Sequence, residues 1–64
     1  MMRAYRCYLL NKAGLISAVE LIECGGDGDA QQAALKMLRE NSQHHAIEVW
    51  DQARQVFRQA RDAT

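Results

Sequence analysis

Apolar side chains recur every three or four residues between Asp29 and Asn41, which is the spacing of one face of a helix. The stripe that they form consists of Ala30, Ala33, Ala34, Met37 and Leu38. Its alanines allow close packing against a flat surface, so a β-sheet is the expected partner. Asp29 is the expected N-cap, with Gln32 completing a capping box, and Asp27 is the alternative cap.

Two stretches rich in aliphatic and aromatic residues precede this helix, at Arg3–Asn11 and Ile16–Cys24. The segment between them ends in Gly14, the residue type that hairpin loops use for a positive φ. A three-residue loop, 12–14, would place Asn11 opposite Leu15. The two stretches therefore predict a β-hairpin.

The pairing of charges and the grouping of apolar side chains favour one register for this hairpin. Pairing Arg6 with Glu20 and Cys7 with Val19 sets opposite charges across the strands. It also gathers apolar side chains on one face, namely Tyr5, Cys7, Leu9, Val19 and Leu21. A shift of one residue would bring Glu20 onto that face, so we prefer this register.

The segment Ala46–Trp50 is typical of a third strand, but the residues after it have two interpretations. Apolar residues with helical spacing predict a C-terminal helix that Asp51 could cap, at positions Ala53, Val56, Phe57 and Ala60. Alternatively, 52–53 form a two-residue turn and Gln55–Gln59 is a fourth strand. That hairpin would pair Asp51 with Arg54 and Val49 with Val56. The pattern alone slightly favours the helix.

A resemblance favours the hairpin instead. The motifs Tyr5–Leu10, Ala18–Cys24 and Ile47–Asp51, the last followed by Ala53-Arg54, resemble a group of very short bacterial proteins common in rhizobia and their relatives. No function is established for that group. Its members usually carry glycine in the turn after the tryptophan, which implies a hairpin; this chain has Gln52 and Ala53 there.

We therefore predict a single α+β domain over residues 1–64 with the order strand–strand–helix–strand–strand. It should have two layers, a four-stranded, mainly antiparallel sheet and one helix on one of its faces. The strand order 2-1-3-4 places the most apolar strand, the first, in the centre. The alternative is three strands with a C-terminal helix.

Composition excludes several classes of protein. Eight basic and eight acidic residues give a net charge of zero, so the strong positive field of a nucleic-acid binder is missing. No apolar run approaches the ~20 residues that span a membrane, and the N-terminus has no apolar signal core. A cytoplasmic protein with reduced thiols is the expectation.

The residues that could carry chemistry have simpler structural interpretations. Cys7 and Cys24 would lie about 16 Å apart along the strand, so both should be free thiols. His44 and His45 lack the spacing of a zinc site. The segment 25–29 has the residues of a turn and a cap, and its aspartates would repel phosphate.

The chain also lacks a recognisable arrangement for catalysis. Two histidines on one loop define no catalytic geometry, so we expect no enzyme, no catalytic residue, no cofactor and no metal. Three arginines near the C-terminus, Arg54, Arg58 and Arg61, are flanked by Asp51 and Asp62, which favours a solvated face over a nucleic-acid site.

The sheet face away from the helix is the expected functional surface. Residues predicted for it include six large apolar or aromatic ones: Tyr8, Leu10, Ile16, Ile22, Trp50 and Phe57. Because a solvated face should be polar, we expect a homodimer through this face. The alternatives are an antitoxin-like or other protein-binding module, and a ligand-binding protein with its site at the subunit interface.

Overall fold

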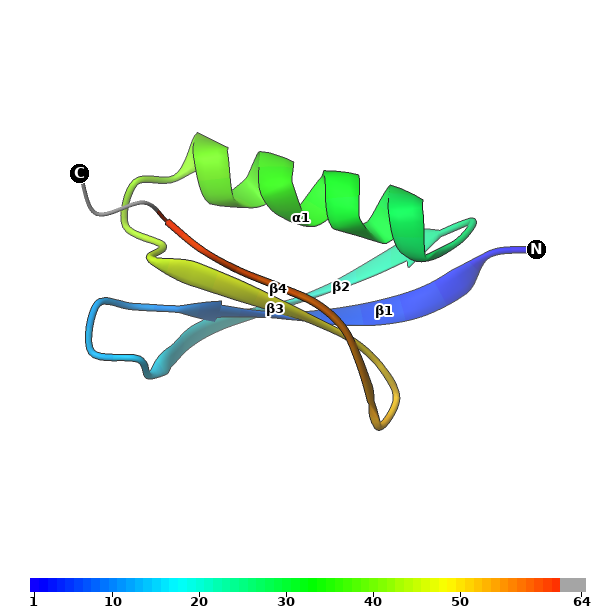
Figure 1. The fold of residues 1–64 in the computed structure, drawn as a ribbon, viewed down its shortest axis with the longest axis horizontal. Helices are drawn as coiled ribbons and strands as arrows, with labels where there is room; N and C mark the ends of the chain where they lie inside the picture. The colour runs from blue at the N-terminus through cyan, green and yellow to red at the C-terminus, as the bar shows by residue number, and fades with distance from the viewer. Residues whose placement is uncertain (62–64) are drawn as a thin grey trace.

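The computed structural model describes residues 1–61 and contains four strands and one helix (Figure 1). In chain order these are β1 (Arg3–Leu10), β2 (Ile16–Cys24), α1 (Asp27–Glu40), β3 (Ala46–Asp51) and β4 (Arg54–Ala60). The strands form one antiparallel sheet in the order β2-β1-β3-β4. Figure 1 shows α1 lying along one face of this sheet. The predicted α+β fold and strand order are confirmed, and the C-terminal segment is a strand rather than a helix.

The helix begins earlier than the sequence predicted. Its N-cap is Gly26, with extended backbone and no side-chain cap, so the predicted cap at Asp29 is wrong. The backbone N–H of Ala30 donates to the carbonyl of Gly26 and closes the first turn. Asp27 and Asp29 lie in this turn, where their negative charges complement the positive end of the helix dipole.

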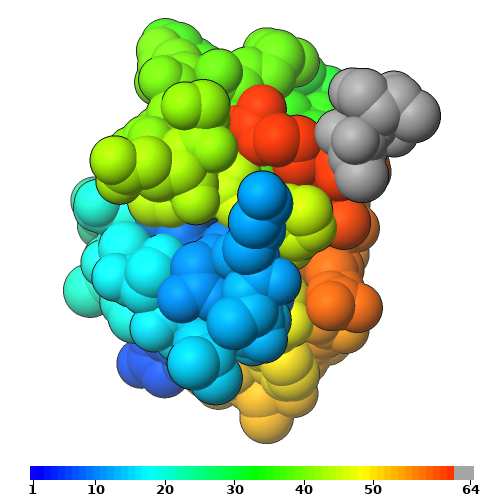
Figure 2. All heavy atoms as spheres, turned by 90° about the vertical axis from the view of Figure 1, so that its left-hand side faces the viewer, coloured from blue at the N-terminus to red at the C-terminus, as the bar shows by residue number. Residues whose placement is uncertain are grey.

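The other end of the helix is capped by Arg61, the residue that follows β4. The guanidinium of Arg61 donates to the carbonyl oxygens of Leu38 and Asn41, and its Nε donates to the carbonyl of His44. Figure 2 shows this end of the molecule, where the end of β4 lies against the end of the helix. Arg61 therefore satisfies helix carbonyls that have no partner within the helix.

The first hairpin has the predicted loop but not the predicted register. Asn11 N–H donates to the Leu15 carbonyl and Gly14 has a φ of 82°, as expected. Beyond the pair Leu10–Ile16, however, a bulge at Ser17 shifts every later pair by one residue. Ser17 Oγ donates to the Leu9 carbonyl at 3.1 Å. Arg6 consequently pairs with Leu21, and the predicted Arg6–Glu20 pairing is wrong.

The second hairpin contains a bulge of the same kind. Asp51 pairs with Arg54 across a two-residue turn, as predicted. Val56 is then passed over, so that Val49 pairs with Phe57 and not with Val56. The bulge brings Phe57 to the helix side of the sheet, where it packs against the core.

The core lies between the helix and the sheet. The helix contributes Ala30, Ala34 and Leu38, with Ala33 and Met37 partly buried beside them, which confirms the predicted stripe. The largest fully buried side chains come from the two central strands: Tyr5 and Cys7 from β1, and Ile47 and Val49 from β3. Only the helix side of the sheet is filled in this way.

Candidate interaction face and adjoining pocket

The opposite side of the sheet, here called the open face, is covered by no element among residues 1–61. Paired residues on neighbouring strands point to the same side, so the register defines its members. These are Ala4, Arg6, Tyr8 and Leu10 of β1, Ile16, Val19, Leu21 and Glu23 of β2, Ala46, Glu48 and Trp50 of β3, and Gln55, Arg58 and Ala60 of β4.

Large aliphatic side chains on β2 are the main apolar feature of the open face. Leu21 is 72% exposed, Ile16 is 57% exposed and Val19 is 50% exposed. Tyr8 and Trp50 extend this surface across β1 and β3 and are half-buried. Monomers seldom leave a contiguous apolar surface of this kind on a sheet.

The polar groups of the open face are arranged around these residues. The indole N–H of Trp50 donates to Glu48 at 3.1 Å, and Arg58 approaches the same carboxylate at 3.5 Å. Arg6 donates to the Tyr8 hydroxyl at 3.2 Å. No acidic group among residues 1–61 lies within ion-pair distance of Arg6.

The predicted interface residues fall into three groups. Tyr8, Ile16 and Trp50 lie on the open face as predicted. Leu10 has the predicted register, but it is 6% exposed and so has little surface to offer. The placement of Ile22 and Phe57 on this face is wrong, because the two bulges bring both residues to the helix side.

Val19 and Leu21 were missed for the same reason. The register predicted from the Arg6–Glu20 pairing placed them in the core, and the bulge at Ser17 places them on the open face. A signal was present in the sequence: Ser17 is a short polar residue near the start of an apolar strand. Such a residue can replace a strand hydrogen bond with its own hydroxyl.

A charged network closes the end of the molecule where the helix begins. The Tyr5 hydroxyl donates to Asp27 at 2.8 Å, and Arg54 binds the same carboxylate through two nitrogens at 3.0 and 3.2 Å. Arg54 also binds Asp51 at 3.1 Å, and Arg3 binds Asp51 at 2.9 Å. The network joins β1, α1, β3 and β4.

The network shifts the pKa values of its members. Hydrogen bonds from Arg54 and then from Tyr5 lower the pKa of Asp27. Burial, followed by the hydrogen bond to Asp27, raises the pKa of Tyr5. Hydrogen bonds to Asp27 and Asp51 raise the pKa of Arg54. All three groups are therefore held in the charge state that the network requires at neutral pH.

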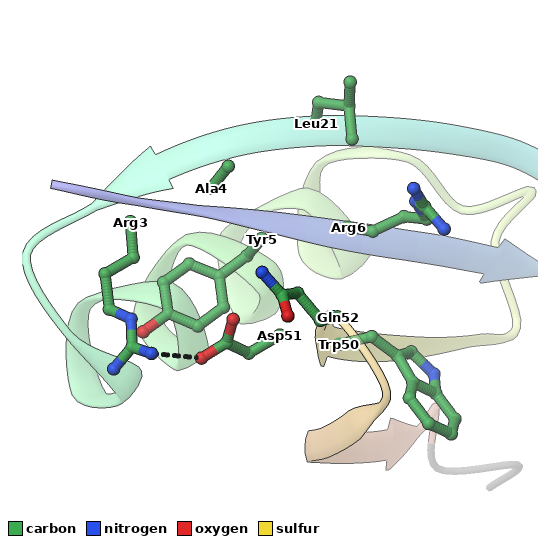
Figure 3. A pocket seen from close by; sticks show the side chains of 8 residues that line it. All are labelled: Arg3, Ala4, Tyr5, Arg6, Leu21, Trp50, Asp51 and Gln52. Atoms are coloured by element: carbon green, nitrogen blue, oxygen red, sulfur yellow. Dashed lines mark ion pairs between the residues drawn. The ribbon is translucent and has the colours of Figure 1, made fainter.

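A pocket of about 350 Å³ lies beside this network and reaches the open face (Figure 3). It is lined by Arg3, Ala4, Tyr5, Arg6, Leu21, Trp50, Asp51 and Gln52. Gln52 lies in the β3–β4 turn with a φ of 57°, a conformation that residues other than glycine adopt at a cost. Local sequence patterns do not predict this pocket, because its lining comes from three strands and a turn.

The remaining candidate residues have structural roles. Cys7 and Cys24 are buried free thiols, as predicted, and burial raises the pKa of Cys7 to about 11. Among residues 1–61 no group of three or more metal-binding side chains is found. The Nδ1 of His44 is buried and has no hydrogen-bond partner within residues 1–61, while the side chain of His45 is half-buried.

The three arginines near the C-terminus are engaged within the chain. Arg54 binds Asp27 and Asp51, Arg58 contacts Glu48, and Arg61 caps the helix. They therefore do not form the uncompensated positive surface that a nucleic-acid backbone requires.

Within residues 1–61, no helix has both the length and the apolar character needed to cross a membrane. Comparison with protein-family models, with curated proteins and with solved structures found no match for this chain.

Proposed function

We propose that the chain is a small, non-catalytic interaction protein that forms a homodimer through the open face. The exposure of three large aliphatic residues of β2 on a sheet face that the helix leaves uncovered carries this proposal. Burying such side chains is favourable by about 25 cal/mol per Å² of apolar surface. A second copy of the same face supplies matching apolar surface without requiring another protein.

The open face carries charges of both signs, with Arg6 and Arg58 beside Glu23 and Glu48. A twofold arrangement can set an arginine of one copy against a glutamate of the other.

Self-association would also add the stability that a domain of this size lacks. A chain of this length buries only about 60% of its unfolded surface and has little core to stabilise it. Both cysteines are free, so no disulfide adds stability within residues 1–61. The buried thiols agree with a reducing compartment, and we propose the cytoplasm as the location.

Sedimentation equilibrium at tens of micromolar tests the proposal with a matched pair of variants. Leu21→Lys places a charge among the exposed apolar residues of β2 on the open face and should yield monomers. Leu15→Lys makes the same change at a residue that is 64% exposed but lies in the hairpin loop, so it should leave the dimer intact.

Three results would refute the proposal: a folded wild-type chain that sediments as a monomer, a Leu21→Lys variant that remains a dimer, and equal dissociation of both variants. A monomer that binds a different protein through the same face would favour the protein-binding alternative.

A further inference from the structure

The pocket beside the β3–β4 turn has a base formed by one row of paired residues. Leu21 of β2, Arg6 of β1 and Trp50 of β3 are direct neighbours across three adjacent strands. Neighbouring strands lie about 4.8 Å apart, so an aliphatic group, a guanidinium and an indole are set side by side. Figure 3 shows all three side chains at the pocket, with Gln52 beside Asp51 and Trp50 where β3 leads into the turn.

Arg6 differs from the other two arginines near the pocket. Arg3 and Arg54 are both bound to Asp51, and Arg54 is also bound to Asp27. Arg6 has only the Tyr8 hydroxyl as a side-chain partner among the described residues. Glu48, the acidic residue of β3 on the same face of the sheet, is occupied by Trp50 and Arg58. Within residues 1–61, Arg6 is thus the one guanidinium of the pocket that has no ion-pair partner.

The remaining lining favours a flat, partly apolar ligand. Trp50 is held by its hydrogen bond to Glu48, Leu21 is mostly exposed, and Ala4 leaves open space next to Arg6. A volume of about 350 Å³ lies at the lower end of the ~300–1,000 Å³ found for small-molecule sites. A guanidinium matches the two oxygens of a carboxylate, and an indole packs well against another ring.

We propose that this pocket binds a small aromatic carboxylate, with its carboxylate on the guanidinium of Arg6 and its ring between Trp50 and Leu21. The site goes beyond the proposed homodimer and does not need it. Arg6, Leu21 and Trp50 also lie on the open face, so the ligand and a second copy of the chain would compete for this surface.

Titration with phenylacetate, followed by ¹H–¹⁵N NMR, tests the site directly. Trp50 is the only tryptophan, so its indole N–H signal reports the pocket without ambiguity. Phenylacetate should shift the signals of Trp50 and Arg6 saturably at millimolar concentration. Acetate lacks the ring and phenylacetamide lacks the charge, so both should bind at least about tenfold more weakly. Equal responses to all three compounds, or no saturable response to phenylacetate, would overturn the proposal.

Variants separate the role of Arg6 from a general effect of charge. Arg6→Gln should weaken phenylacetate binding about tenfold or more, and Arg6→Lys should retain part of it because the charge remains but the paired donors are lost. Arg39→Gln removes the same charge from an exposed helix position and should bind like the wild type. If Arg6→Gln remains folded and binds like the wild type, the site is refuted.

Sedimentation of the same samples distinguishes this site from the proposed dimer. Binding by a wild-type chain that sediments as a monomer without ligand would support the pocket and refute the dimer. A dimer that shows no saturable binding even at dilutions where it dissociates would refute the pocket alone.

Discussion

The two faces of the sheet are made from the same four strands, yet they differ sharply in their relation to solvent. Beneath the helix, Tyr5, Cys7, Ile47 and Val49 have essentially no exposed surface. On the open face, Leu21 and Val19 are at least half exposed, although they are as apolar as the residues of the core. A sheet that alternated between a core and a solvated face would be polar on its second side. We propose that both faces are built for burial, one within the chain and one by association.

The largest expected effect comes from placing the same charge on each face. Ile47→Asp buries a carboxylate with no partner at a position with no exposed surface, which costs several kcal/mol and should unfold the chain. Leu21→Asp places the carboxylate on the exposed side of β2, so its circular dichroism spectrum and cooperative unfolding should persist. Two unfolded variants, or two folded ones with equal melting temperatures, would remove the distinction between the faces.

Unfolding at alkaline pH tests the burial of Cys7 on the helix side of the sheet. The pKa of Cys7 rises from 9.0 to about 11 in the folded protein, so the unfolded chain loses this proton first. The thiol therefore does not lower the free energy of unfolding below pH 9. As the pH rises from 9 towards 11, the free energy of unfolding falls by about 1.4 kcal/mol per pH unit, which is roughly 3 kcal/mol in all. Urea unfolding at a series of pH values measures this loss.

Two variants assign this loss of unfolding free energy to individual side chains. Cys7→Ala should abolish the decrease in unfolding free energy between pH 9 and 10. A further decrease above pH 10 should remain, because the raised pKa of Tyr5 acts in the same direction, and Tyr5→Phe should remove it. A Cys7→Ala variant with an unchanged pH dependence below pH 10 would show that the thiol is not the source.

A smaller effect is expected at the turn beside the open face. Gln52 has a positive φ, which glycine adopts without strain, so Gln52→Gly should stabilise the chain by up to about 1 kcal/mol in thermal or urea unfolding. Ala53→Gly changes the next residue, whose φ is not positive, and should destabilise by a similar or smaller amount. If Gln52→Gly destabilised the chain and Ala53→Gly stabilised it, the strain would lie elsewhere in the turn.

The sequence predicted the elements and their order, but not which strand residues lie on which face. The helical stripe, the loop with Gly14 and the pair Asp51–Arg54 follow from local spacing, and all are present. The bulges at Ser17 and Val56 each add one residue to a strand, and such a residue exchanges the two faces for everything beyond it. The prediction therefore failed for Ile22 and Phe57.

The pocket and the charged network could not be predicted for a different reason. Tyr5, Asp27 and Arg54 come from three distant parts of the chain, and only the folded arrangement brings them within hydrogen-bond distance. Asp27 was considered as a helix cap, yet it binds two side chains from the sheet instead. Local patterns contain no information about such contacts.

The most direct test of the central claim, that the open face is covered by a second copy, is an isotope-filtered NMR experiment on mixed labelled and unlabelled chains. The methyl groups of Val19 and Leu21 should show cross-chain contacts to the ring of Trp50 or Tyr8, while the methyl groups of Ile47 should show contacts only within their own chain. Cross-chain contacts confined to other surfaces, or their complete absence at concentrations where the chain is folded, would contradict the account.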